Sequence, residues 1–134
     1  MDTTTPPATP APTTEDKTVA ILSYLTLIGF IVAIVLHSNK KTRLGAFHLR
    51  QVLGFFLTAI ACWICVAIMI FILTVVLSFM KSFVLFLIPL IHLAVGVSVF
   101  VLWLLGFIAA LNGQMKPMPV VGPMYQKWFA NVFE

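Results

Sequence analysis

The most restrictive feature of this sequence is a long, almost uncharged stretch in its second half. Between Gln51 and Met115, only Lys81 and His92 can carry a charge near neutral pH. A charged side chain in hydrocarbon costs several kcal/mol unless it is paired or reaches an interface. A stretch of this length with so few charges therefore predicts that lipid is its solvent and that the chain is an integral membrane protein.

The composition of the whole chain agrees with this prediction. Of its 134 residues, 61% are hydrophobic and 9% are charged, whereas about a quarter of the residues in a typical soluble domain are charged. The net charge is +4, but the cations lack the clustering of a nucleic-acid surface. We interpret them as topology signals and headgroup contacts, and expect the lipid bilayer, not nucleic acid, as a partner.

Three apolar runs predict an all-α integral membrane bundle that forms a single membrane domain over residues 18–134. They cover residues 19–36, 52–80 and 83–111. As helices they would be about 27, 43 and 43 Å long, so the first just spans the bilayer and the others must tilt, bend or project beyond it. Pro89 predicts a kink in the third. Residues 1–17, rich in Thr, Pro and Ala, are expected to be a disordered tail without a cleavable signal.

The end of the chain predicts a further, shorter helix. Several glycines and prolines break the third run, and Pro123 can then begin a helix over about residues 124–133. Met124, Trp128 and Val132 share one face of it. About ten residues are too few to cross a bilayer, so we expect an amphipathic helix lying in the interface.

The distribution of Lys and Arg predicts an orientation, because cytoplasmic loops are enriched in both. The basic loop 37–50 and the segment after the third span hold most of the cations: Lys40, Lys41, Arg43, Arg50, Lys116 and Lys127. Only Lys17 and Lys81 would lie on the other side of a three-span protein. We therefore expect a bacterial inner-membrane protein with its amino terminus outside and the basic loop and carboxyl terminus in the cytoplasm.

Small residues recur at intervals of four and predict close helix packing. These positions are Gly29 and Ala33, then Gly54, Thr58 and Cys62, then Gly106 and Ala110. The helix that packs there can belong to the same chain, to another copy or to another membrane protein. Cys62 and Cys65 form a CxxC pattern, which we interpret as packing because apolar burial disfavours a reactive thiolate.

His92 is the one histidine well inside a predicted span. Three functional interpretations are a proton relay, an ion pathway and an axial haem ligand. The structural interpretation is a neutral His92 side chain that is hydrogen-bonded to Thr, Ser or a carbonyl oxygen across a helix interface. A second haem ligand would have to come from His37 or His48, which lie at a different predicted depth. Zinc would need four ligands. We expect neither a metal nor a cofactor.

The segment Leu44–Gly54, LGAFHLRQVLG, is the most specific motif. Phe47 can anchor in the interface and Arg50 can reach lipid phosphates. His48 and Gln51 are three residues apart on one helix face, available to hydrogen-bond a neighbouring loop. These four residues are either a contact site for lipid or a protein partner, or simply the anchor of a helix end.

With the preceding span and basic loop, the Phe-His-x-x-Gln element resembles the bacterial relatives of the Tic-twenty-type chloroplast import component. The likeness runs from Lys17 to Phe129 and includes Asn112-Gly113 and the PVVGPMYQKWF ending. The resemblance implies a small polytopic inner-membrane protein without known enzymatic activity. Plastid members are four-helix translocon components, a pattern from which three spans and an interfacial helix depart.

These observations predict a non-enzymatic accessory or structural subunit of a membrane complex, similar to import-translocon components. No Asp or Glu lies between Lys17 and Asn131, and no catalytic triad or phosphate-binding glycine loop can be assembled. The alternative is a small oligomeric conductor of ions or solutes that uses His92. The sequence leaves open the partner, the oligomeric state and the physiological process.

Overall fold

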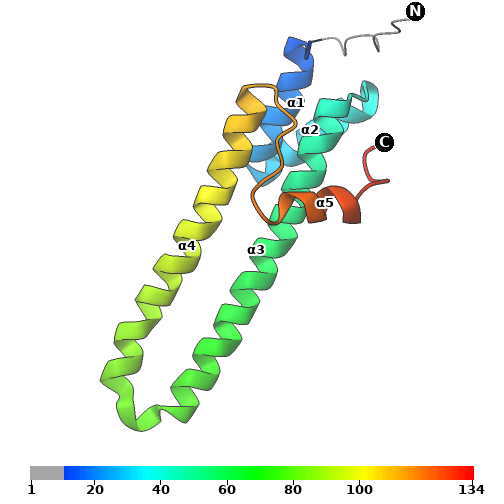
Figure 1. Ribbon diagram of the computed structural model, residues 1–134. Helices are drawn as coiled ribbons and strands as arrows, with labels where there is room; N and C mark the ends of the chain where they lie inside the picture. Colours follow the sequence, from blue (N-terminus) through cyan, green and yellow to red (C-terminus); the bar gives the residue numbers. More distant parts are fainter. Residues whose placement is uncertain (1–10) are drawn as a thin grey trace, which may run out of the picture.

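The computed structural model describes residues 11–134, which form five α-helices joined by short connections. The fold is all-α, as the sequence predicts (Figure 1). The elements are α1 (Thr14–Leu25), α2 (Leu27–Asn39), α3 (Arg43–Val76), the short 3₁₀-helix η1 (Ser78–Met80), α4 (Lys81–Leu111) and α5 (Gly122–Trp128).

Helices α3 and α4 form a long antiparallel hairpin that turns at η1 (Figure 1). Their 34 and 31 residues correspond to about 51 and 46 Å, more than the hydrocarbon thickness of about 30 Å. Both are apolar enough to cross a membrane, and only 6% of the most apolar window of each is buried within the chain. These are the predicted second and third spans. Helix α3 begins at Arg43, well before residue 52, because Thr42 caps it by accepting a hydrogen bond from the Gly45 amide at 3.1 Å.

The predicted first span, residues 19–36, is not one helix. Thr26 has extended backbone angles, ends α1 and begins α2 by accepting a hydrogen bond from the Gly29 amide at 3.0 Å. Gly29 lies so close to α1 that a Cβ atom there would be 2.5 Å from the Leu22 carbonyl oxygen. The 12 and 13 residues of the two helices reach only about 18 and 20 Å, so neither spans the bilayer alone.

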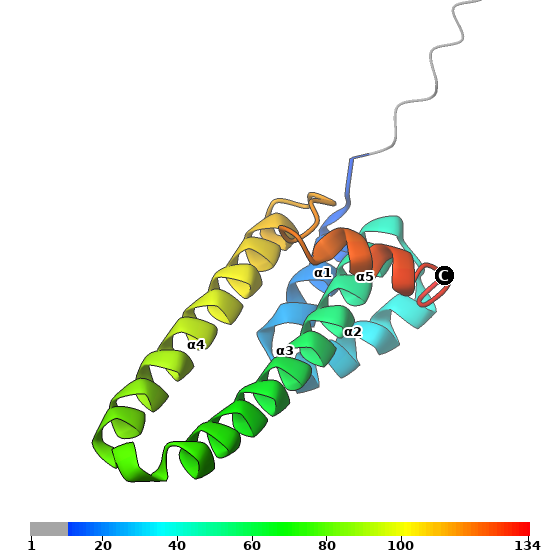
Figure 2. The same ribbon diagram turned by 60° about the horizontal axis from the view of Figure 1, so that its bottom comes forward.

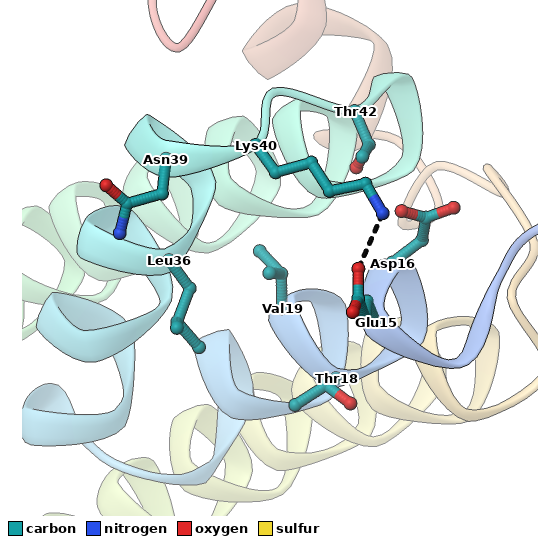
Figure 3. Close-up of a pocket in the computed structure, with 8 residues that line it drawn as sticks. All are labelled: Glu15, Asp16, Thr18, Val19, Leu36, Asn39, Lys40 and Thr42. Atoms are coloured by element: carbon teal, nitrogen blue, oxygen red, sulfur yellow. Dashed lines mark hydrogen bonds and ion pairs between the residues drawn. The ribbon is translucent and has the colours of Figure 1, made fainter.

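The chain therefore runs away from one end of the molecule along α1 and returns to it along α2 (Figures 1 and 2). Figure 3 shows the result: Lys40, just after α2, reaches Glu15 at the start of α1 across 2.5 Å. The hydrogen bond and the negative charge of Glu15 raise the pKa of the Lys40 amine. Residues 11–17 and 37–43 therefore share one end of the molecule, an arrangement that does not fit the predicted orientation, in which the amino terminus lies across the membrane from the basic loop.

The two ends of the described chain also differ from prediction. Helix α1 begins at Thr14 because Thr13 and Asp16 form a reciprocal capping box. Residues 14–17, expected to belong to the tail, are therefore helical. The rest of that tail, residues 1–10, lies outside the described residues. Helix α5 has Pro123 in its first turn as predicted, but it ends at Trp128 and not at residue 133. It crosses α3 in both views (Figures 1 and 2).

The buried core lies at the end of the molecule where α1, α2 and α5 meet the start of α3 and the end of α4. We call this part the cap; it comprises α1, α2, residues 43–58 of α3, residues 102–111 of α4, and residues 112–134. Its core residues include Ala20, Tyr24, Leu49, Met118 and Tyr125. Beyond the cap, the large apolar side chains of α3 and α4 are mostly exposed, as expected of a surface that faces lipid.

Candidate functional site

Three buried polar side chains meet at the centre of the cap. Tyr24 comes from α1, and His48 and Gln51 come from the first turns of α3. The Gln51 amide nitrogen donates to the Tyr24 hydroxyl at 2.9 Å, and the same hydroxyl lies 3.2 Å from His48 Nδ1. His48 and Gln51 have no exposed surface, and Tyr24 is 3% exposed. Because unpaired polar groups are costly to bury, this cluster has to satisfy its own hydrogen bonds.

The segment between α4 and α5 completes the network. His48 Nε2 lies 2.9 Å from the Gln114 carbonyl oxygen, and the Met118 amide donates to Gln51 Oε1 at 3.1 Å. A carbonyl oxygen can only accept, so Nε2 of His48 carries the hydrogen. In the neutral ring, Nδ1 then accepts from the Tyr24 hydroxyl, which itself accepts from Gln51. Every bond in the network has one donor and one acceptor. The bonds link α1, the start of α3 and the segment between α4 and α5, and so hold these three parts of the chain together.

This arrangement gives His48 and Gln51 a specific role. The sequence places both on one helix face, available to a neighbouring loop, and the structure shows that loop to be residues 112–121 between α4 and α5. Their complete burial prevents direct contact of either side chain with lipid or with another protein. In this structure, the two side chains hold the cap together.

Phe47 and Arg50, the other residues of the motif, lie at the edge of the cap. The Phe47 carbonyl oxygen accepts a hydrogen bond from the Gln126 side chain at 2.9 Å, and Phe47 is only partly buried. Arg50 donates from Nε to the Val132 carbonyl oxygen at 2.8 Å and forms an ion pair with Glu134 at 3.1 Å. These two residues remain the part of the motif that a ligand can reach.

The small residues lie where other parts of the same chain approach closely. Gly54 faces Tyr125 of α5, whose ring would be 2.3 Å from a Cβ atom at that position. The Tyr125 hydroxyl donates to Thr58 at 2.8 Å, and burial raises the pKa of the Tyr125 hydroxyl. Gly106 faces Tyr24 and Met118 in the same way.

The remaining packing positions have different surroundings. Ala33 and Ala110 are fully buried in the core. Cys62 is half-buried and lines a cavity of about 360 Å³ between α3, α4 and α5, while Cys65 is exposed. Both cysteines are free.

His92 lies on the exposed surface of α4, outside the cap. Its Nδ1 atom is 2.9 Å from the Ile88 carbonyl oxygen of its own helix, and its ring packs 5.5 Å from the Trp63 ring of α3, measured between centroids. This is a local hydrogen bond to a carbonyl oxygen, within one helix and not across an interface. His37 and His48 lie in the cap, so the structure does not bring the three histidines together.

Four further residues complete the site, and none of them is predicted to belong to it from the sequence alone. Tyr24 and Met118 supply the partners of Gln51, Tyr125 fills the notch at Gly54, and Trp103 donates to the Tyr24 carbonyl oxygen at 3.0 Å. The last bond satisfies a carbonyl that the end of α1 leaves without a partner. Tyr24 and Trp103 are polar-tipped aromatics within apolar runs, and this is the only signal that could have singled them out.

Comparison with known families decides the family of the chain. The family model described as the magnetosome magnetite crystal formation protein family, MamF/MmsF, matches residues 15–125. The chain belongs to this family. Comparisons with curated proteins and with solved structures gave no match. The matched range contains all five helices except the first residue of α1 and the last three residues of α5, and thus nearly the whole cap and the long hairpin.

Membership of the MamF/MmsF family corrects the resemblance to chloroplast import components. The chain is a small membrane protein of a magnetosome-associated family, and a role in protein import has no support. The resemblance rested on the Phe47–Gln51 motif and on apolar spans. Apolar spans resemble one another in unrelated membrane proteins, and the motif by itself did not distinguish the two families.

Proposed function

We propose that this protein is a non-enzymatic structural component of a membrane assembly that supports magnetite crystal formation. The observation that carries the proposal is the family match over residues 15–125. The structure supports it because the three polar side chains at the centre of the cap, Tyr24, His48 and Gln51, bond to one another and to the backbone. Catalysis needs a polar group presented to a substrate, whereas these groups fix how the helices are arranged.

The charges favour one orientation for this component. Of the eight Lys and Arg residues, Lys81 alone lies at the turn of the long hairpin, and the other seven lie at the cap end: Lys17, Lys40, Lys41, Arg43, Arg50, Lys116 and Lys127. Because cations are enriched on the cytoplasmic side of a membrane, we place the cap and both ends of the described chain in the cytoplasm, at the bacterial inner membrane or a membrane derived from it. The short turn at η1 then faces the opposite compartment.

This orientation favours an indirect role in crystal formation. A mineral surface in the opposite compartment would meet only the turn around Ser78 and Lys81. The cap, which holds most of the polar surface, would instead meet cytoplasmic or membrane partners. We therefore propose that the chain influences the crystal by organising its membrane and the proteins in it.

The test is complementation in a magnetite-forming bacterium from which its own family member has been deleted. We expect this chain to restore the crystal dimensions measured by electron microscopy. The double variant His48→Ala/Gln51→Leu should fail because it opens the cap, whereas His92→Ala should complement because His92 lies outside it. Crystals that stay as in the deletion strain, although immunoblots show the unmodified chain in the membrane, would refute the proposal.

A further inference from the structure

A basic cavity of about 420 Å³ lies at the edge of the cap, where α3 begins. The carboxyl-terminal residues of the chain form its opposite side. Its lining includes three cations, one carboxylate and three large apolar side chains: Lys41, Arg43, Arg50, Glu134, Phe47, Met115 and Phe133. This concave surface is basic, and neither the proposed function nor the buried network uses it.

The charges in this cavity are only partly balanced. Arg50 pairs with the Glu134 carboxylate at 3.1 Å, and its side chain is 15% exposed, so it is held in place by the cavity wall. Lys41 donates a hydrogen bond to the Glu134 backbone carbonyl oxygen. Among the side chains that line the cavity, three are cations and one is a carboxylate. This arrangement attracts an anion, and the Glu134 carboxylate occupies part of the place that the anion would take.

The position of the cavity favours one source of that anion. The basic residues lie at the end of α3 from which its exposed apolar surface runs into the bilayer. Phe47 and Met115 provide an apolar wall beside the cations. A phospholipid presents a phosphate next to acyl chains, and so matches both parts, whereas free phosphate matches only the cations.

We propose that this cavity binds the phosphate of an anionic phospholipid headgroup through Lys41, Arg43 and Arg50, in competition with Glu134. The chemistry is that of charge-assisted hydrogen bonds from ammonium and guanidinium groups to phosphate oxygens. The Glu134 carboxylate is a weaker internal substitute, because it brings no acyl chains to the apolar wall of the cavity. The proposal does not depend on the role in crystal formation.

Native mass spectrometry of the purified full chain in neutral detergent can count the bound lipids. The probes are phosphatidylglycerol, phosphatidylcholine and inorganic phosphate. We expect one phosphatidylglycerol to bind more tightly than phosphatidylcholine. Lys41→Gln/Arg43→Gln should weaken that binding about thirtyfold, since each cation near a membrane surface contributes about 1 kcal/mol, or fivefold. The side chains of Lys41 and Arg43 are both exposed, so their replacement leaves the core intact.

Two further variants make the test specific. Lys116→Gln/Lys127→Gln removes the same charge from exposed positions outside the cavity and should leave binding unchanged. Glu134→Gln removes the competing carboxylate and should tighten binding up to about fivefold. Equal losses in the two double variants would overturn the proposal. Phosphate binding that needs Lys41 and Arg43, without a preference for phosphatidylglycerol, would overturn the assignment to lipid.

Discussion

At the scale of single residues, Gln51 determines whether the cap can close. Its amide uses both ends, one as a donor to Tyr24 and the other as an acceptor from the Met118 backbone. An apolar side chain of similar size would leave the Met118 amide without an acceptor and the Tyr24 hydroxyl without a donor. The cost of leaving buried groups unpaired is about 1–3 kcal/mol each, larger than the net gain from forming one hydrogen bond.

Replacement of Gln51 by leucine should therefore lower the free energy of unfolding of the purified protein by about 2–4 kcal/mol, and with it the unfolding temperature. Gln114→Leu is the matched control, because its exposed side chain forms no hydrogen bond within the described residues and only its backbone carbonyl joins the network. The measurement is thermal unfolding in detergent followed by circular dichroism. Equal unfolding temperatures for the two variants would contradict the role assigned to Gln51.

Gly54 and Gly96 make a second comparison, because both lie inside apolar helices but have different surroundings. A methyl group at Gly54 would overlap the Tyr125 ring, whereas nothing lies within 4 Å of the corresponding position at Gly96. We expect Gly54→Ala to destabilise the docking of α5 by about 1–3 kcal/mol through overpacking. Gly96→Ala should be neutral or slightly stabilising.

Limited proteolysis of the segment after Gly122 measures this docking directly. Faster cleavage is expected in Gly54→Ala than in Gly96→Ala. In a Tyr125→Ala background, Gly54→Ala should have little further effect, because the overlapping ring is gone. An undiminished effect in that background would show that the alanine acts through something other than Tyr125.

At the scale of elements, the pair α1 and α2 changes the topology of the whole protein. Two short helices that return to the end where they began do not carry the chain across the membrane. One 18-residue helix would carry it across once. The separation depends on Thr26, whose hydroxyl caps α2, and on Gly29, which lets the backbones approach. The Trp103 side chain stabilises the same turn from α4.

Single cysteines in a chain lacking Cys62 and Cys65 can test this topology. Under the proposed orientation, a membrane-impermeant maleimide added to intact spheroplasts should label Ser78→Cys at the hairpin turn. Thr14→Cys and Ser38→Cys should react only after the membrane is opened, because both lie at the cap end. Labelling of Thr14→Cys together with Ser78→Cys in intact cells would instead favour a single first span.

The sequence predicted most elements but not how they meet. Uncharged length was enough to find α3 and α4, and Pro123 marked the start of α5. Uncharged length failed at residues 19–36, because hydropathy does not reveal that the Thr26 hydroxyl caps a new helix there. For the site, the spacing of His48 and Gln51 predicted a contact with a loop. Their partners Tyr24, Gln114 and Met118 are 24 to 67 residues away, so no local pattern could identify them.

At the scale of the whole molecule, two parts are stabilised by different means. The cap contains the buried core and the polar network, and so it depends on contacts within the chain. The middle of the hairpin has few such contacts, and its apolar side chains are mostly exposed. Its backbone hydrogen bonds are satisfied within each helix, and in a bilayer no water competes for them. The hairpin therefore depends on lipid more than on the cap.

This difference predicts that the two parts open separately. In lipid nanodiscs, moderate urea should increase amide hydrogen exchange in residues 14–39 and 114–128 while residues 60–75 remain protected, because local opening follows local stability. Gln51→Leu should lower the urea concentration at which the cap exchanges and leave the protected segment unchanged. Hydrogen-exchange mass spectrometry of peptic fragments resolves the two regions. Simultaneous exposure of all three segments at one urea concentration would show instead that cap and hairpin form a single cooperative unit.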